Sequence, residues 1–332
     1  MHGMTKQDSL VTVRKPAWHG LGETLQEAPS RDVAEKKVSD YQVLREPLYR
    51  KVPIVTEDGP SHEFVLYEEA ELNVRSDSGA VFGTVRTERI DPQPSEVWDI
   101  ADFIMKNNKN VVVETAGTYN SGADMYILLK LDELVKVQGD KYGDSYAYCA
   151  LQNAWYAGKA LRFQLTNVRL QCMNTSRLAD LRAADANLNL SLAHTGNMRE
   201  RIEEVQSFMA GWTEGIQQWR LYKEGLASMR VTVKQTNWFI EQFIPEPKSD
   251  KLISDRVRDN INVARLELLN ELYSDFNSGV RGTALGLFEA ASSYESHVRT
   301  ATSQMSRFKR SMLTPTSILE DAAALALEAV TV

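Results

Sequence analysis

The segment ALQNAWYAGKALRFQLTNVRLQCMNTSRLADLR (150–182) combines a strand-like alternation with a concentration of positive charge. It holds five cations against one acid, so its net charge is 5 − 1 = +4, whereas the whole chain carries −7. Because polyanion binding depends on where cations cluster, this segment predicts a local basic surface on an acidic protein. The five cations are Lys159, Arg162, Arg169, Arg177 and Arg182.

The chain between Tyr41 and Cys172 has the pattern of a meandering, mainly antiparallel sheet. Short apolar or alternating runs are separated by Gly-containing turns, and Asp91-Pro-Gln-Pro ends the first group of strands. Ser95 is a suitable N-cap, and apolar residues recur at helical spacing from Val97 to Met105, which predicts a helix packed on the sheet. The expected strands cover residues 63–67, 71–76, 80–89, 110–119, 124–132, 145–155 and 162–172.

After Asn174 the pattern becomes almost wholly helical. We expect one long amphipathic helix over 198–226, others over 251–274 and 283–312, and a last helix opened by the capping box at 317–320. The fold class is therefore α+β, an antiparallel sheet with a packed helix followed by a mainly helical C-terminal half. The expected divisions are an N-terminal arm (1–40), an α+β core (41–190) and a helical domain (191–332).

Several function classes lack a sequence signal. No phosphate-loop or dinucleotide fingerprint occurs, and the five histidines and two cysteines have no metal-ligand spacing, so neither a cofactor nor a metal site is expected. Cys149 and Cys172 read as reduced thiols of a cytoplasmic protein. No run approaches the roughly 18 apolar residues of a membrane span.

Asn174, Thr175 and Arg177 mark an expected strand-to-helix junction. The free N–H groups and the dipole at a helix start attract phosphate, and Arg177 adds a formal charge. The alternative is that Asn174 or Thr175 caps the helix and does nothing more. Strand alternation places Arg162 and Arg169 on opposite faces, so both reach one groove only across a bulge or edge.

Trp155 and Tyr156 are candidates for base stacking, which is worth about 1–3 kcal/mol per base. Neighbours on a strand point to opposite faces, so one ring of the pair is expected in the core. His194 and Arg199 are further candidates for phosphate contact. No nucleophile that would make His194 a catalytic base is identifiable, and no catalytic residue is assigned.

The arrangement Gly117…Gly122, ALQNAW, TNVRLQCMNTSRLA and AHTGNMRERI resembles a phage- and plasmid-borne family known as the LGT family, long described as a domain of unknown function. PAWHGLGET (16–24) resembles its opening motif, and GTALGLFEAASSYESHVR (282–299) its late helical motif. The residues that match the family's central elements are Arg169, Cys172, Asn174, Thr175, His194 and Thr195.

The order of a sheet with a packed helix, a basic corner and a helical second half also resembles the phage single-strand annealing proteins, lambda Red-beta and relatives of Rad-fifty-two. That resemblance implies an annealase-like core in a homo-oligomeric ring or helical filament. The oligomer would hold single-stranded DNA and promote annealing in phage recombination and DNA repair without nucleotide hydrolysis. A phage exonuclease or the host single-strand-binding protein would be further partners, in a bacterial cytoplasm.

Two rival functions come from other classes. The first is a nucleic-acid-processing enzyme that uses His194 and a core acid. The second is a structural or partner-binding phage protein whose amphipathic helix 198–226 makes the contacts.

Overall fold

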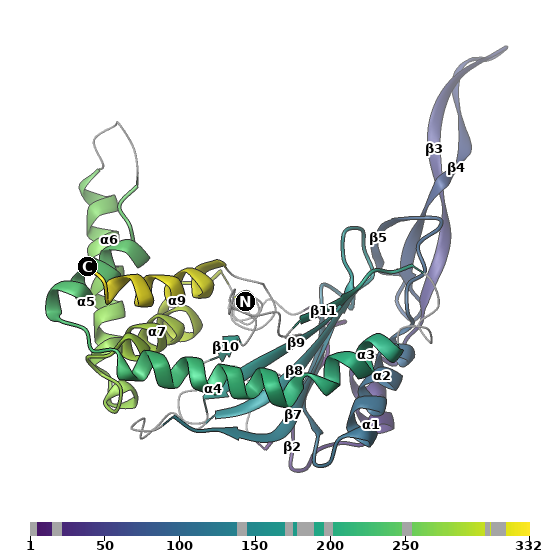
Figure 1. Ribbon diagram of the computed structural model, residues 1–332. Coiled ribbons are helices and arrows are strands. Elements are labelled where there is room, and N and C mark those ends of the chain that lie inside the picture. Colours follow the sequence, from purple (N-terminus) through teal and green to yellow (C-terminus); the bar gives the residue numbers. More distant parts are fainter. Residues whose placement is uncertain are drawn as a thin grey trace.

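The computed structural model contains one large sheet, one small sheet and a group of helices (Figure 1). A long hairpin leaves the body at one end, and the helices that follow residue 232 lie at the other end (Figure 1). The residues that the structure describes are 5–14, 22–137, 145–169, 175–177, 189–195, 202–247, 254–302, 306 and 317–332.

The large sheet has the order β10-β9-β8-β7-β6-β1-β2, and β11 also pairs with β9. Every pairing is antiparallel except that of β1 with β2. The central strands are apolar on both faces, as expected for strands covered on two sides. Its strands are β1 (Leu10–Val13), β2 (Glu23–Leu25), β6 (Val112–Tyr119), β7 (Asp124–Val135), β8 (Ser145–Ala154), β9 (Leu161–Arg169), β10 (Thr175–Arg177) and β11 (Asn189–Leu192).

Three helices share one apolar core with the large sheet: α1 (Arg31–Val38), α2 (Pro94–Asn107) and α3 (Ile202–Ala210). Helix α2 begins with a capping box in which Gln93 and Glu96 satisfy each other's backbone N–H groups. Its Trp98 is fully buried and donates from Nε1 to Ser39 Oγ at 2.9 Å.

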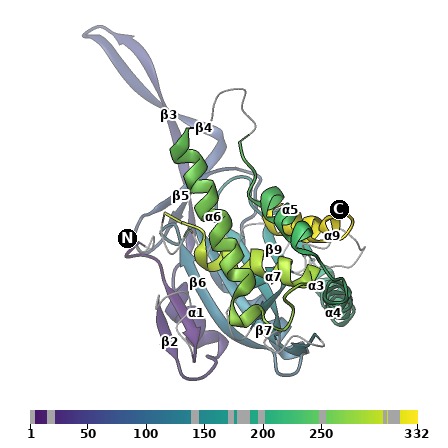
Figure 2. The same ribbon diagram turned by 90° about the vertical axis from the view of Figure 1, so that its left-hand side faces the viewer.

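The small sheet consists of β3 (Val43–Thr56), β4 (Gly59–Arg75) and β5 (Val81–Arg86) in that order. Strand β5 pairs with only the last part of β4, from Ala70 to Val74. The outer part of the β3–β4 hairpin is therefore a two-stranded ribbon, and it projects beyond the body in both views (Figures 1 and 2).

The C-terminal half is helical, as the sequence predicts. Helix α7 is buried along nearly its whole length, and the Nζ atom of Lys223 on α4 lies 2.6 Å from Glu289 Oε1 on α7. The helices are α4 (Trp212–Ser228), α5 (Val233–Phe243), α6 (Asp255–Tyr273), a 3₁₀ turn (Asp275–Asn277), α7 (Ala284–Ser293), a π-helical turn (Tyr294–Val298) and α9 (Ser317–Ala329).

The mixed α+β class is confirmed, and the helical second half is confirmed in part, since strands β10 and β11 follow Asn174. The division at 40 and 190 needs correction. The first 40 residues are no separate arm, since β1 pairs with β6 inside the large sheet and α1 packs on α2. Strand β11 extends to Leu192 and pairs with β9, so the sheet continues beyond residue 190.

The helix start expected at Asn174–Ser176 is wrong for the residues that are described there. Thr175–Arg177 form strand β10, with Thr175 opposite Val168 and Arg177 opposite Thr166. A β-strand has no helix dipole, so the predicted phosphate site at a helix N-terminus loses its basis here.

Two helices also differ from the prediction. The expected helix over 198–226 is interrupted at Gly211, between α3 and α4. The helix expected over 283–312 ends its regular part at Ser293, after which one π-helical turn leads to Arg299.

Candidate functional site

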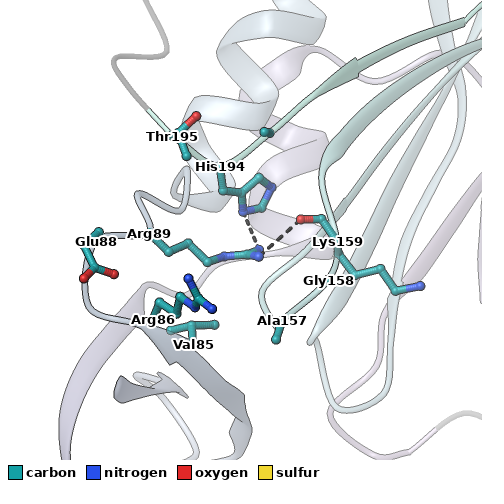
Figure 3. A pocket seen from close by; sticks show the side chains of 10 residues that line it. Val85, Arg86, Glu88, Arg89, Ala157, Gly158, Lys159, His194 and Thr195 are labelled. Atoms are coloured by element: carbon teal, nitrogen blue, oxygen red, sulfur yellow. Dashed lines mark hydrogen bonds between the residues drawn. The ribbon is translucent and has the colours of Figure 1, made fainter. Parts of the chain in front are cut away.

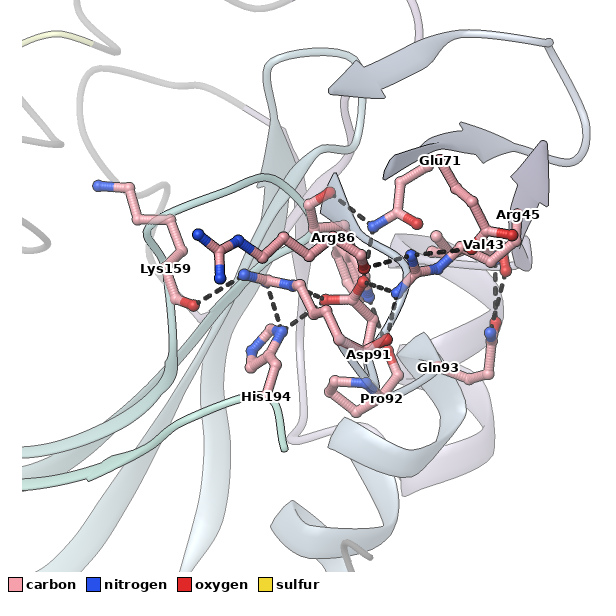
Figure 4. A network of polar contacts seen from close by, with 12 residues as sticks. Val43, Arg45, Glu71, Arg86, Asp91, Pro92, Gln93, Lys159 and His194 are labelled. Carbon is pink, nitrogen blue, oxygen red and sulfur yellow. Dashed lines mark hydrogen bonds and ion pairs between the residues drawn. The ribbon is translucent and has the colours of Figure 1, made fainter. Parts of the chain in front are cut away.

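A buried polar network centres on the carboxylate of Asp91, directly after β5 and before α2 (Figure 4). The side chain of Asp91 is only 3% exposed. Its Oδ1 accepts from Arg89 Nε at 2.6 Å and lies 2.5 Å from His194 Nδ1. Its Oδ2 accepts from Asn73 Nδ2 at 2.7 Å and from Arg45 at 2.9 Å.

This network sets the ionisation of Asp91. Burial by itself would raise the pKa of the carboxyl group, but hydrogen bonds from His194, Asn73 and Arg89 outweigh it and lower the pKa to about 2. Asp91 is therefore a permanent anion at neutral pH that compensates the neighbouring guanidinium groups.

Arg89 connects this network to the turn between β8 and β9. Its guanidinium donates to the carbonyl oxygens of Lys159 at 3.2 Å and Ala154 at 3.0 Å, and it lies 2.5 Å from His194 Nδ1. Charge-assisted bonds of this kind are stronger than neutral ones, so Arg89 fixes the small sheet against the turn.

A pocket of about 420 Å³ lies over this junction (Figure 3). Its lining contains three cations and one acid, contributed by segments far apart in the sequence. Val85 and the buried His194 form part of its floor, and Arg86 and Lys159 are exposed. The charged residues of the lining are Arg86, Glu88, Arg89 and Lys159.

The turn at 155–158 is held by close packing with the small sheet. Asn73 Nδ2 donates to the carbonyl oxygen of Trp155 at 2.8 Å. Gly83 has φ +153°, and a Cβ atom at that position would lie 2.9 Å from the Cβ of Tyr156. Glycine is thus needed where β5 approaches the turn, and this approach places Arg86 and Lys159 in the lining of one pocket.

Lys159 and His194, two of the predicted contact residues, come together in this pocket, and so does Thr195. Arg162 does not line it. Arg162 lies in β9 between the buried Leu161 and Phe163, so it faces away from the apolar core and is half-buried.

Base stacking by Trp155 is a wrong prediction. Trp155 is fully buried, its Nε1 donates to the carbonyl oxygen of Pro92 at 2.6 Å, and its ring packs near Tyr41 and Phe82. Tyr156 is half-buried beside the pocket, with Lys159 Nζ 5.8 Å from its ring centre and its hydroxyl donating to Asp124. As the two-face argument predicts, one ring of the pair belongs to the core.

The remaining predicted residues cannot be assigned to the pocket. Asn174, Arg182 and Arg199 lie outside the described residues. For Arg169, Thr175 and Arg177 the structure describes the backbone, at the end of β9 and in β10, but not the side chains.

Sequence reasoning missed Arg86, Arg89 and Asp91. Over residues 86–91 two cations stand against two acids, so a charge count shows no excess. The only sequence signal here is the acid before proline, Asp91-Pro92, and this pattern predicts the end of a sheet without indicating a polar network.

A family model described as a domain of unknown function (DUF932) matches residues 91–314, which is more than half of the chain. The chain belongs to this family. The matched region begins at Asp91 and includes Lys159 and His194, whereas Arg86 and Arg89 precede it.

The comparison with curated proteins and the comparison with solved structures found no match. Neither supports the expected likeness to single-strand annealing proteins. Among the described residues, no cluster of His, Cys, Asp and Glu is arranged to hold a metal ion. In that same part of the chain, no helix combines the length and the apolar character that crossing a membrane requires.

Proposed function

We propose that this member of the DUF932 family binds single-stranded DNA at the pocket between β5 and the β8–β9 turn. The observation that carries the proposal is that three cations from distant segments, Arg86, Arg89 and Lys159, line one pocket of an acidic chain. Phosphate groups are the ligands that such clustered cations favour.

Two of these cations are available to a ligand. Arg86 and Lys159 are exposed, and among the described residues neither side chain forms an ion pair. The ammonium of Lys159 extends from the rim of the pocket, away from Arg89 (Figure 3). Arg89 contributes through its charge and by holding the turn, because Asp91 already occupies its Nε.

The backbone of the turn offers further donors. Within the described chain, no acceptor is hydrogen-bonded to the N–H groups of Ala157, Gly158 or Lys159. Gly158 has φ +75°, and consecutive N–H groups around such a residue form concave anion sites. Tyr156, next to Lys159, supplies a ring on which a base can stack.

The size of the pocket favours a single strand. A volume of about 420 Å³ suits one small group or one nucleotide unit. A duplex, in contrast, is usually read by a helix or ribbon that enters its major groove.

The specific activity in the proposal is annealing without nucleotide hydrolysis, the activity that the resemblance to the phage single-strand annealing proteins implies. A homo-oligomer would join one modest site per subunit into a continuous basic track. Base pairing between strands would then supply both specificity and driving force. Arg162, Arg169, Arg177, Arg182 and Arg199 remain candidates to extend the track.

Substitution of both exposed cations tests the proposal. In Arg86→Ala/Lys159→Ala we expect a loss of at least about tenfold in affinity for a labelled single-stranded oligonucleotide, measured by fluorescence anisotropy. The slope of log affinity against log salt should fall by about 1.4, since each phosphate contact on a single strand contributes about 0.7.

A charge-matched control variant distinguishes the effect of the pocket cations from the effect of a lower net charge. Lys36→Ala/Lys109→Ala removes two exposed cations elsewhere and should leave affinity and slope unchanged. Equal losses in both double variants would show that the pocket has no special role, and unchanged affinity in the pocket variant would refute the site.

The pairing of His194 with Asp91 favours a second candidate, an enzyme that processes nucleic acid. His194 Nδ1 lies 2.5 Å both from Asp91 Oδ1 and from the guanidinium of Arg89. In the tautomer whose Nδ1–H donates to Asp91, Nε2 carries the lone pair of a general base. However, Nε2 is buried, and Arg89 packs on the same imidazole. These contacts favour a positioning role for His194.

An assay for cleavage or modification of a labelled oligonucleotide distinguishes the enzyme from the annealing protein. We expect full-length oligonucleotide to remain after incubation with Mg²⁺ or Mn²⁺. Cleavage or modification that disappears in His194→Ala would favour the enzyme over the annealing protein.

A further inference from the structure

The face of β9 that points away from the apolar core carries polar side chains. Every second residue over 161–165 belongs to the core, so strand alternation places Arg162 and Gln164 on the opposite face. The residues directly opposite Arg162 are Gln152 on β8 and Ser191 on β11, and residues paired in this way share a face. We call Gln152, Arg162, Gln164 and Ser191 the polar row.

The side chains of the polar row have open hydrogen-bonding groups. Gln152, Arg162 and Gln164 are half-buried, and Ser191 is exposed. None of the hydrogen bonds or ion pairs within the described part of the chain involves these four side chains. Polar groups with restricted access to water usually have a hydrogen-bond partner, so these open donors and acceptors are suited to a polar ligand.

The polar row begins where the pocket ends. Lys159 lines the pocket, and Arg162 follows it by three residues, which is at most about 10 Å of extended chain. Ala193 also lines the pocket, and Ser191 precedes it by two residues, about 7 Å along the chain. Strands β9 and β11 are paired side by side (Figure 1), so two neighbouring strands lead from the pocket to the polar row.

We propose that the polar row is a second contact site for single-stranded DNA, and that one strand runs from the pocket along β9. Arg162 contacts a phosphate group, and the amide groups of Gln152 and Gln164 donate to phosphate or sugar oxygens. This inference rests on the proposed function, because the pocket holds the first part of the same strand. It adds the path that the strand takes over the protein.

The chemistry of the polar row fits the sugar-phosphate backbone. The row holds one cation and no acid, and its other side chains are two amides and a hydroxyl. Side chains of these kinds supply many of the hydrogen bonds that proteins make to phosphate and sugar, and such contacts carry no sequence information. Bases that are held only through their backbone stay free to pair, as annealing requires.

The acids near this path do not oppose a phosphate at the polar row. Among the side chains that the structure describes on this face of β7 and β8, Asp124 is the one acid. It is buried, and its carboxylate already accepts hydrogen bonds from Tyr156 and Asn120. Glu88 and Lys159 lie on opposite sides of the pocket (Figure 3), so the path leaves the pocket on the side away from Glu88.

A protein partner fits the polar row less well than a nucleic acid does. The centre of a protein–protein interface is usually apolar, whereas the polar row contains no apolar side chain. A duplex is disfavoured by the pocket at the start of the path, because a volume of about 420 Å³ suits a single nucleotide unit.

Substitution of Arg162 tests the phosphate contact. In Arg162→Gln we expect the affinity for a labelled single-stranded oligonucleotide, measured by fluorescence anisotropy, to fall by about tenfold. The slope of log affinity against log salt should fall by about 0.7, the share of one phosphate contact on a single strand. Arg162→Lys keeps the charge and should keep the wild-type slope.

Substitution of the two amides tests the row without a change of charge. In Gln152→Leu/Gln164→Leu we expect a loss of about tenfold in affinity at an unchanged salt slope, because the slope depends on ionic contacts alone. The control is Lys109→Ala, which removes one exposed cation outside both sites and should leave affinity and slope unchanged.

Unchanged affinity and slope in Arg162→Gln would overturn the inference, and so would equal losses in Lys109→Ala. In either case, wild-type binding that depends on Arg86 and Lys159 would still support the proposed function. Failure of the wild-type protein to bind the oligonucleotide would refute the proposed function and the inference together.

Discussion

At the scale of single residues, Asp91 is the residue on which the junction depends. It compensates two guanidinium groups, Arg45 and Arg89, while almost fully buried. Without it, Arg89 would hold a buried positive charge next to His194, and the turn that presents Lys159 would lose its anchor.

Asp91→Asn should lower the free energy of unfolding by about 3–5 kcal/mol, because removal of one member of a buried pair leaves the other uncompensated. Urea unfolding followed by tryptophan fluorescence measures this loss. Asp99→Asn breaks an exposed pair with Arg31 and should cost less than about 1 kcal/mol. Equal losses would contradict the assigned role.

The pH dependence of stability is a second test of the role of Asp91. The pKa of Asp91 lies at about 2 in the folded protein against an ordinary value of 3.8, so folding favours the ionised form. The resulting stabilisation, about 2 kcal/mol, is present above pH 4 and is lost as pH falls towards 2. Unfolding curves recorded between pH 4 and pH 2 measure this effect. In Asp91→Asn the free energy of unfolding should no longer contain this loss of about 2 kcal/mol on acidification.

Residue types alone predicted part of the site. Lys159 and His194 were identifiable as a cation in a basic run and a histidine near arginines, and the structure brings them together. Arg86 and Arg89 were not identifiable, because Glu88 and Asp91 cancel their charge along the sequence. Only the packing of β5 against the turn brings Arg86 and Arg89 to the same pocket as Lys159.

At the scale of elements, periodicity predicted α2, the sheet and the helical half. It failed where a short segment lies between competing patterns, as at Thr175–Arg177, whose polar residues suit a helix start but pair with β9 instead. It also missed α5, an 11-residue helix whose signal is the capping box formed by Thr232 and Gln235.

The ion pair between α4 and α7 allows a test at this scale. Lys223 and Glu289 are each 1% exposed. We expect Lys223→Met and Glu289→Met singly to cost about 3–5 kcal/mol each, and the double variant to recover most of the loss, because two apolar side chains leave no uncompensated charge. Additive losses in a double-mutant cycle would contradict this account.

At the scale of the whole molecule, the acidic chain brings Arg86, Arg89 and Lys159 from distant segments to one pocket. All residues that line the pocket belong to a single chain, so binding of a short oligonucleotide should not need the oligomer. Annealing of long strands should need both, since a continuous track requires neighbouring subunits.

The most direct measurement is photo-crosslinking of a bromodeoxyuridine-containing single strand, followed by mass spectrometry of the linked peptides. Crosslinks are predicted in the peptide that holds Tyr156 and Lys159, and they should be lost in Arg86→Ala/Lys159→Ala. Efficient crosslinks confined to the β3–β4 hairpin or to helices α4–α9, with none at the β8–β9 turn, would contradict the claim that the pocket binds single-stranded DNA.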